Sequence, residues 1–317
     1  MVKRAHLKSL GDVDIRLVRV FVVVTESGGL AAAEPELNIG RSTISKHIAD
    51  LELRMGLKLC NRGPAGFSLT IEGERVLASA RKLLSSLDDF QSEVDNIHTN
   101  LAGTLRLGLF DQSTTNPNAF IHTAIQKFDR IAPDVSLEIS VEPPTGIEGR
   151  VIDGSMDIGI VPMHRQSNSL SYDVLYDEWM TLYCGAGHAL FDSPEGSLAG
   201  IDLSQYKYAG FGFNSPNMKA GQTLDMRRAA RVQDEEALSL LIQSGSYLGF
   251  LADHVAETFL SKGKVRPIDP ARTRYVSTFA AITRKQPEPD RKTLTFLNCL
   301  IDAHDAAQED RRASVAS

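Results

Sequence analysis

A short turn and helix at residues 38–52 constrain this chain more than any other stretch. The segment reads Asn-Ile-Gly-Arg-Ser-Thr-Ile-Ser-Lys-His-Ile-Ala-Asp-Leu-Glu. Ile44, Ile48 and Leu51 lie three or four residues apart, which places them on one buried stripe of a helix. Polar and cationic side chains occupy its first turns and outer faces: Arg41, Ser42, Thr43, Ser45, Lys46 and His47. Such a helix can read base edges in the major groove of DNA, although an ordinary amphipathic surface helix would show the same pattern.

The neighbouring segments favour the DNA-reading interpretation. Residues 14–26 and 30–37 carry apolar side chains at helical spacing. Two short strands follow, near residues 57–59 and 67–69, and Gly63-Pro64-Ala65-Gly66 joins them as a turn. Three helices and a β-hairpin wing predict a winged helix-turn-helix domain over the first 70 residues.

A long helix with a heptad seam is expected next. Thr70 is a suitable cap for its start, and eight apolar residues from Val76 to Leu101 recur at alternating spacings of four and three. This seam favours pairing with the same helix of a second copy over packing on the chain's own domain. The residues expected at this dimer contact are Leu83, Leu87, Phe90, Val94 and Ile97. Gly103 is expected to interrupt the helix and to act as a hinge.

Beyond the linker helix the hydrophobic pattern alternates between short strands and helices. Strands are expected at 104–110, 135–141 and 156–161, and helices at 119–131 and 147–153. The alternation continues along the remaining chain. It predicts an α/β domain with mostly parallel sheets covered by helices.

Charge and motif content narrow the functional class. The net charge is −6, but the first 70 residues carry ten Lys/Arg against seven Asp/Glu, so a mildly basic head precedes an acidic body. The three cysteines are far apart, which favours reduced, buried thiols over a disulfide framework or a zinc site. The sequence contains no GxGxxG, HExxH, GxxxxGK[ST] or nucleophile-elbow motif, so neither an enzyme nor a metal or cofactor site is expected.

In their order and residues these features resemble the LysR-type transcriptional regulators. The more specific part of the match covers about residues 14–75 and rests on Phe21, Leu37-Asn38-Ile39, Ser45, Lys46, Leu51-Glu52, Gly56, Leu59, Arg62, Gly66, Leu69-Thr70 and Gly73. The later half matches more loosely, at Leu105-Arg106-Leu107-Gly108, Phe128, Pro133, Gly154, Asp157-Ile158-Gly159, His188, Ser244-Gly245 and Gly249-Phe250.

The resemblance implies a three-part chain whose last part is similar to a periplasmic binding protein. The implied boundaries are 1–70 for the DNA-binding domain, 71–101 for the linker and dimerisation helix, and 102–317 for the effector-binding domain. Its two subdomains would span about 104–163 with 273–310, and about 164–272. The resemblance also implies dimers that join through the linker helices and usually assemble as homotetramers.

The chain departs from the family pattern where the recognition helix begins. The family usually has Ser-Gln-Pro there, whereas this chain has Gly40-Arg41-Ser42, and the usual alanine pair of the second helix becomes Ala33-Glu34. Arginine can make a bidentate contact to guanine, whereas glutamine favours adenine. We therefore expect Arg41 to contact a base edge or an adjacent phosphate, and Arg62, on the wing, to grip phosphate. Arg54 completes the expected DNA-binding set.

A second candidate site belongs to the α/β domain. Ligands of an open α/β sheet bind beyond the C-terminal ends of strands, in the crevice between lobes. Hydroxyl groups and aromatic rings at such ends mark the expected effector site: Asp111, Gln112, Ser113, Thr114, Thr145, Pro162, Phe211, Gly212, Phe213 and Phe250. Each hydroxyl could equally be an ordinary helix cap or turn residue. Ser113, Thr114 and Thr115, with the backbone amides near Ala119, could hold an anionic group such as a carboxylate. The carboxylate of Asp111 would repel an anionic ligand unless it pairs with a cation, so a neutral or cationic effector is the alternative.

These features predict a sequence-specific DNA-binding transcriptional regulator that a small organic effector controls. The alternative is a cytoplasmic solute-binding or carrier protein, which the attached winged helix disfavours. Expected partners are double-stranded promoter or operator DNA, the effector, further copies of the chain and RNA polymerase. The sequence has no run of about 18 apolar residues, and no signal core follows its basic start, so a cytoplasmic location without membrane contact is expected.

Overall fold

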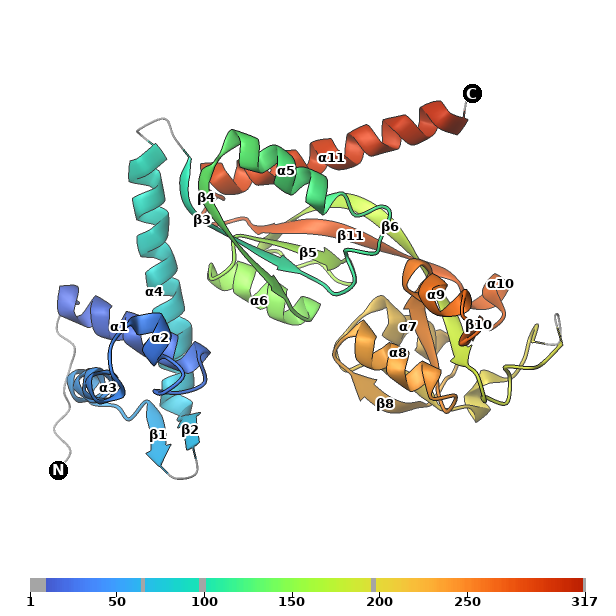
Figure 1. Ribbon diagram of the computed structural model, residues 1–317, viewed down its shortest axis with the longest axis horizontal. Coiled ribbons are helices and arrows are strands. Elements are labelled where there is room, and N and C mark those ends of the chain that lie inside the picture. The colour runs from blue at the N-terminus through green and yellow to red at the C-terminus, as the bar shows by residue number, and fades with distance from the viewer. Residues whose placement is uncertain (1–9, 64–65, 97–100, 195–197, 316–317) are drawn as a thin grey trace. The chain divides into compact units, whose positions relative to one another are not determined.

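The computed structural model describes residues 10–63, 66–96, 101–194 and 198–315 of the chain (Figure 1). By its internal contacts the chain divides into two compact units. The first comprises Met1–Glu93 with Asp153–Ser155, and the second comprises Val94–Ile152 with Met156–Ser317. Ile97, expected at the dimer contact, and Pro64-Ala65, expected in the wing turn, lie outside the described residues.

The first unit is a winged helix-turn-helix domain followed by a long helix. Its elements are α1 Asp12–Glu26, α2 Glu34–Leu37, α3 Arg41–Met55, β1 Cys60–Gly63, β2 Gly66–Leu69 and α4 Ile71–Asn96. α3 has the bounds that the sequence predicts, whereas the second helix is a single turn instead of the predicted 30–37. Pro35 stands in the first turn of α2, where a backbone N–H has no helical partner to lose.

α1 and α3 bury their aliphatic stripes in one core. Phe21 of α1 and Ile44, Ile48 and Leu51 of α3 are all 0% exposed and belong to this core. Full burial of an aliphatic or aromatic side chain stabilises a fold by about 1.5–3 kcal/mol. The core therefore fixes one face of α3 and leaves the opposite face exposed.

Helix α4 divides its heptad seam between two environments. Val76 and Ala80, near its start, pack on the core of their own domain. Phe90 and Val94, further along, are 68% and 42% exposed. The expectation of one continuous partner-facing seam is therefore wrong for the first half of α4, which completes its own domain.

The junction between the wing and α4 requires a glycine. The hydroxyl of Thr70 accepts a hydrogen bond from the N–H of Gly73 at 2.9 Å, so Thr70 caps α4 as predicted. A Cβ atom on Gly73 would lie 1.9 Å from the carbonyl oxygen of Leu59. The start of α4 thus approaches the backbone at Leu59 with no room for a side chain.

The second unit is built on one mixed sheet with strand order β4-β3-β5-β11-β6-β9-β7-β8, and β10 pairs with β6. The strands are β3 Ala102–Leu109, β4 Asp134–Val141, β5 Ile158–Pro162, β6 Leu170–Gly185, β7 Tyr208–Phe211, β8 Arg228–Val232, β9 Leu248–Ala252, β10 Val265–Pro267 and β11 Tyr275–Arg284. β3 is parallel to β4 and β5, and β7 is parallel to β8 and β9. β6 and β11 are antiparallel to each other and to their other neighbours. The prediction of mostly parallel sheets is wrong, because the chain leaves one half of the sheet along β6 and returns along β11.

Helices cover both halves of this sheet. They are α5 Ile121–Ile131, α6 Pro144–Asp153, α7 Pro216–Thr223, α8 Glu235–Gln243, α9 Asp253–Leu260, α10 Pro270–Thr273 and α11 Arg291–Val315, with a 3-10 turn at Leu203–Gln205. α5 and α11 lie on one side of the β3-β4-β5 half and α6 on the other (Figure 1). Phe128 of α5 and Phe296 of α11 pack edge to face at a centroid distance of 5.2 Å. Helices α7 to α10 contact the other half. The unit is thus the predicted α/β domain of two subdomains.

Gly103 does not interrupt a helix. The last described residue of α4 is Asn96, and Gly103 lies in β3 opposite Val135 of β4. The expectation of a hinge at Gly103 is therefore wrong, because pairing with β4 holds this residue in the sheet. An irregularity occurs in β11 instead. The register in which β11 pairs with β6 shifts between Phe279 and Ala280.

Replacing Gly73 by alanine is expected to destabilise the first unit by about 1–3 kcal/mol, because the new methyl group must displace the backbone of Leu59. Urea denaturation followed by circular dichroism measures the free energy of unfolding. The matched control is Gly149→Ala in α6, where no heavy atom lies within 4 Å of the added Cβ and alanine has the higher helix propensity. Equal stability of the two variants would contradict the close approach at Gly73.

Candidate DNA-binding surface and ligand cavity

The start of α3 presents the candidate DNA-reading side chains. α3 begins at Arg41, with Gly40 as its N-cap. Arg41, Ser42 and Thr43 are exposed, as is Lys46 one turn later, whereas Ser45 and His47 are half-buried. The side chains of Arg41 and Lys46 have no hydrogen bond or ion pair to any described residue. These two cationic side chains therefore have no partner in the described structure and can reach a base edge or a phosphate.

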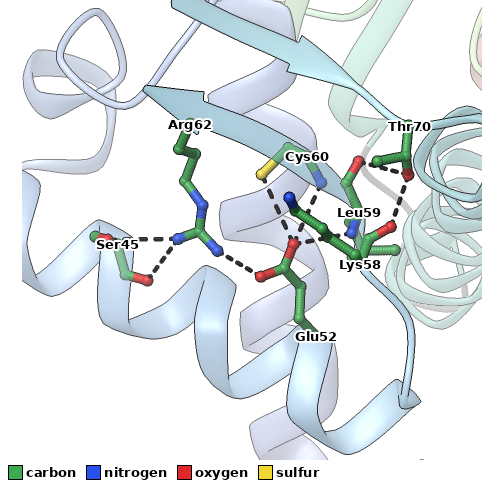
Figure 2. A network of polar contacts seen from close by, with 7 residues as sticks. All are labelled: Ser45, Glu52, Lys58, Leu59, Cys60, Arg62 and Thr70. Atoms are coloured by element: carbon green, nitrogen blue, oxygen red, sulfur yellow. Dashed lines mark hydrogen bonds and ion pairs between the residues drawn. The ribbon is translucent and has the colours of Figure 1, made fainter. Parts of the chain in front are cut away.

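Glu52, near the end of α3, ties the wing to the recognition helix (Figure 2). Oε1 of Glu52 accepts hydrogen bonds from the backbone N–H groups of Leu59 and Cys60, at 2.8 and 3.2 Å. Its Oε2 pairs with the guanidinium of Arg62 in β1. Arg62 also donates to the carbonyl and hydroxyl oxygens of Ser45, at 3.1 and 3.4 Å. One carboxylate and one guanidinium thus hold β1 against α3.

A second ion pair joins the end of α3 to the start of α1. The guanidinium of Arg54 donates two hydrogen bonds to the carboxylate of Asp14, which is 1% exposed. The bond from Arg54, followed by one from the backbone N–H of Gly11, holds the pKa of Asp14 below its usual value. Two of the three arginines that the sequence assigned to DNA, Arg54 and Arg62, therefore have structural partners. Direct contact of either with phosphate stays a prediction.

A small cavity lies in the second unit where the two halves of its sheet meet. Strand ends and helix starts from both halves line it: Phe110, Pro162, Glu178, Met180, Phe211, Phe213, Ser215, Pro216, Asn217, Glu235, Tyr275, Ser277 and Phe279. Its volume is about 20 Å³, which is room for one water molecule. The ring of Phe110 lies edge-on to those of Phe211 and Phe213, with centroids 5.8 and 6.0 Å away. The cavity is thus a compact, largely aromatic compartment.

Two carboxyl groups line this compartment, and they differ in the hydrogen-bond partners that the described residues supply. Glu178 of β6 accepts a hydrogen bond from Asn116 at 2.8 Å and pairs with Nε2 of His254 at 2.9 Å. Glu235, at the start of α8, is 2% exposed, and its Oε2 has no hydrogen-bond partner among the described residues. Burial, reinforced by the negative charges of Glu178 and Asp111, raises the pKa of Glu235 well above its usual value. The site without a ligand therefore favours a neutral, protonated Glu235.

A buried amide adds a hydrogen-bond donor to the same compartment. Asn217, at the start of α7, is 2% exposed. Its Oδ1 accepts a hydrogen bond from the hydroxyl of Tyr275, whereas its Nδ2 has no partner within the described ranges. The cavity therefore holds one unpartnered carboxyl oxygen and one unpartnered N–H donor.

The structure brings three of the ten predicted effector residues to this cavity: Pro162, Phe211 and Phe213. Asp111 does not line it, but its carboxylate accepts a hydrogen bond from the backbone N–H of Glu235 at 3.0 Å. The remaining predicted residues do not line the cavity: Gln112, Ser113, Thr114, Thr145, Gly212 and Phe250.

The surroundings of these residues account for the difference. Ser113 donates its hydroxyl hydrogen to the carbonyl of Phe110 at 2.9 Å, which is the turn role that was its alternative. Thr114 and Thr145 are exposed. Phe250 is 0% exposed in the core of the β9 half. Its assignment to the effector site is corrected, because strand alternation turns its ring into that core.

Among the polar residues that line the cavity, the prediction from sequence missed Glu178, Asn217 and Glu235. Asn217 and Glu235 each follow a strand and begin a helix, which is the position that drew attention to residues 111–114. They could have been found by the same rule. Glu178 offered no such signal, because an acidic residue within a long strand usually faces solvent.

Other classes of site have less support. In the described ranges, no group of three or more His, Cys, Asp or Glu side chains is placed to hold a metal ion. No helix among the same residues is long and apolar enough to cross a membrane. Cys60, Cys184 and Cys299 are buried free thiols, as expected, and burial raises the pKa of Cys184 to about 11.

Comparison with known proteins identifies relatives of both units. The family model for the bacterial regulatory helix-turn-helix protein, lysR family, matches residues 15–74. The family model for the LysR substrate binding domain matches residues 98–305. The HTH-type transcriptional activator BauR of Pseudomonas aeruginosa is 35% identical over 298 residues, which cover 94% of this chain and 98% of that protein.

Solved structures show the same fold at lower identity. The crystal structure of CbnR, a LysR family transcriptional regulator, has a TM-score of 0.62 at 17% identity and covers 92% of this chain and 99% of CbnR. Full-length CbnR complexed with its target DNA has a TM-score of 0.61 at 17% identity, covering 91% of this chain and 99% of that one. At this identity the likeness shows the fold alone.

Replacing Arg41 by alanine is expected to weaken specific DNA binding by about 1–3 kcal/mol and to relax the preference at one base pair, because it removes an uncommitted cation at the start of α3. Fluorescence anisotropy with the DNA upstream of the protein's own gene, and with a scrambled duplex, measures both effects. Arg130→Ala, which removes an exposed arginine of α5, is the control. An Arg41→Ala protein with unchanged affinity and unchanged sequence preference would refute the contact.

Removing the side chain of Arg62 is expected to lower the stability of the first unit, because Arg62 holds the wing against α3. Arg62→Ala and Glu52→Ala should each destabilise the first unit, and the double variant should lose less than their sum, with a coupling of about 1–3 kcal/mol. Chemical denaturation of the four proteins measures this coupling. A direct phosphate contact predicts a different result: Arg62→Ala would leave stability almost unchanged and lower the slope of log affinity on log salt by about one.

Proposed function

The chain belongs to the LysR family of transcriptional regulators, and from this premise we propose that it binds specific DNA sequences and that a small organic molecule in the cavity controls its activity at a promoter. Its relatives are regulators rather than enzymes. The observation that carries the proposal is the combination, in one chain, of uncommitted cations at the start of α3 with unpartnered polar groups in a buried cavity.

The architecture of the sheet supports control by a ligand. β6 and β11 run between its two halves, and both contribute to the cavity wall. A cavity of about 20 Å³ cannot hold an organic molecule unless the two halves move. The register shift between Phe279 and Ala280 gives β11 an irregular point where a strand can bend. A ligand that binds one arrangement of the halves more tightly shifts the population towards it.

Self-assembly through α4 is the second part of the proposal. Phe90 and Val94 are exposed on α4, and with Leu83, Leu87 and Ile97 they form the expected dimer contact. An apolar groove beside the start of α4 is lined by Leu10, Val18, Met55, Leu57, Arg75, Val76, Ser79, Ala80 and Leu83. A second copy would cover these surfaces, and two dimers would form the homotetramer. Ligand-dependent movement would then change the spacing of the α3 helices on DNA, with RNA polymerase as a further partner in the cytoplasm.

Binding of the full chain to the DNA upstream of its own gene tests the function. We expect salt-sensitive, sequence-specific binding, together with a footprint that changes when a compound from a thermal-shift screen is saturating. Ligand binding without DNA affinity would indicate a solute carrier instead. DNA binding that no stabilising compound alters would refute control by an effector.

Replacing Phe90 by aspartate is expected to convert the assembly to a smaller species and to weaken DNA binding at least about tenfold, because a charge on the seam opposes helix pairing and divalent binding is lost. Light scattering measures the molecular mass, and a gel shift measures the affinity. Ile71→Asp, at a residue of the same helix that is 71% exposed and off the seam, is the matched control. Unchanged mass of the Phe90 variant would exclude this dimer contact.

A further inference from the structure

The carboxyl groups of Glu178 and Glu235 line the cavity, and a third, that of Asp111, lies next to Glu235 without lining it. The carboxylate of Asp111 accepts hydrogen bonds from the backbone N–H groups of Gln112 and Glu235, at 2.8 and 3.0 Å. Glu178 is paired with His254 at 2.9 Å. Of the three, only Glu235 has a buried carboxyl oxygen without a partner in the described structure. Glu235 is therefore the carboxyl group of this site whose charged form has no compensating partner among the described residues.

The groups that face Glu235 do not supply a cation. Tyr176 of β6 and Tyr275 of β11 are phenols, and burial raises the pKa of each further above its usual value, so both stay neutral. His254 of α9 already pairs with Glu178. Asp111, on the segment after β3, adds negative charge. The described residues thus leave the carboxyl of Glu235 without a positive partner.

We propose that the cavity takes a small organic ammonium ion whose N–H groups bind the carboxylate of Glu235, and that this ion is the effector. The inference rests on the proposed function, because it takes the cavity to be the effector site. The rings of Phe110, Phe211 and Phe213 suit a cation, since aromatic faces attract positive charge. An anionic ligand would meet the carboxyl groups of Glu178 and Glu235, and a neutral apolar ligand would leave the buried carboxyl oxygen of Glu235 without a hydrogen bond.

The unpartnered amide narrows the ligand class further. Asn217 lines the same cavity as Glu235, and its unpartnered Nδ2 can donate a hydrogen bond to an oxygen atom of a ligand that enters there. The hydroxyl groups of Ser215 and Ser277 are also in the wall. The ligand class is therefore a small protonated amine that also carries an acceptor oxygen, such as an amino alcohol.

Binding of this cation is coupled to a proton. Without a cation, burial favours the protonated form of Glu235, because it raises the pKa of the carboxyl. An ammonium group beside the carboxylate lowers this pKa, so ligand binding releases a proton. The affinity then falls as the pH drops below the raised pKa, by up to about tenfold per pH unit. Glu178, whose carboxylate lies 2.9 Å from Nε2 of His254, and Asp111 are the charged groups that face Glu235.

Isothermal titration calorimetry on the full chain tests the ligand class with four compounds of similar size: 3-amino-1-propanol, n-propylamine, 1-propanol and propionate. We expect the amino alcohol to bind most tightly. The amine should bind about tenfold more weakly, because it leaves Asn217 unpaired, and the other two should not bind measurably. Titrations in two buffers of different ionisation enthalpy should show release of up to about one proton per bound amine.

Glu235→Gln tests the role of the carboxylate. It should lower the affinity for 3-amino-1-propanol at least about tenfold and remove the pH dependence, because the amide neither pairs with ammonium nor titrates. Glu236→Gln, at the exposed neighbouring residue, should bind like the parent protein. Thermal melting reports whether the Glu235 variant is folded, and the pH dependence of the parent protein tests the proposal even if it is not.

The possible outcomes separate this inference from the proposed function. Binding of propionate or 1-propanol that alters DNA binding would overturn the ammonium class and leave effector control standing. Failure of both amines to bind at millimolar concentration would also overturn it, as would a Glu235→Gln protein that keeps the pH dependence. If sodium or magnesium chloride gave the same binding heat as 3-amino-1-propanol, the cavity would bind inorganic cations, and the organic ammonium class would be overturned. Loss of sequence-specific DNA binding in the gel shift would count against the proposed function alone.

Discussion

A carboxylate that is buried in a protein loses hydration free energy on the order of several kcal/mol. Only a nearby cation or hydrogen-bond donors can compensate for this loss. In the first unit this requirement is met at Asp14 by Arg54 and at Glu52 by Arg62. The first pair joins α1 to α3. The second pair, shown in Figure 2, joins α3 to the wing. The position of the recognition helix depends on both. Arg41 has no such partner among the described residues, so its side chain is available for the DNA contact that we propose.

The same requirement distinguishes a structural group from a binding group in the second unit. Glu178 has hydrogen bonds from Asn116 and His254, so its burial is explained within the fold. The carboxyl of Glu235 has no such partner and lowers the stability of the site without a ligand. A cationic ligand would supply the missing compensation only where it binds. That difference in free energy between two states is what a ligand-dependent population shift requires.

Features that depend on neighbours in the chain could be predicted from the sequence. α3 has its predicted bounds and Thr70 caps α4, because helical periodicity and capping are local. Asp14 and Arg54 are 40 residues apart, and no local pattern indicates their pairing. The parallel sheet was predicted wrongly for the same reason, since the antiparallel crossing of β6 and β11 is a long-range feature. At the cavity, Phe211 could be predicted from its place at the end of a strand, whereas Glu178 lies in the middle of one.

The aromatic contacts across the cavity set how much free energy a ligand must supply. The ring of Phe110 comes from the β3 half of the sheet, and those of Phe211 and Phe213 come from the β7 half. Aromatic pairs contribute about 0.5–1.5 kcal/mol each beyond their buried area, so these two pairs favour the compact arrangement by about 1–3 kcal/mol. A hydrogen bond to a charged group contributes a similar amount, about 1.5–3 kcal/mol. One ammonium–carboxylate contact at Glu235 is therefore of the right size to offset the separation of the rings and to change the population of the two arrangements.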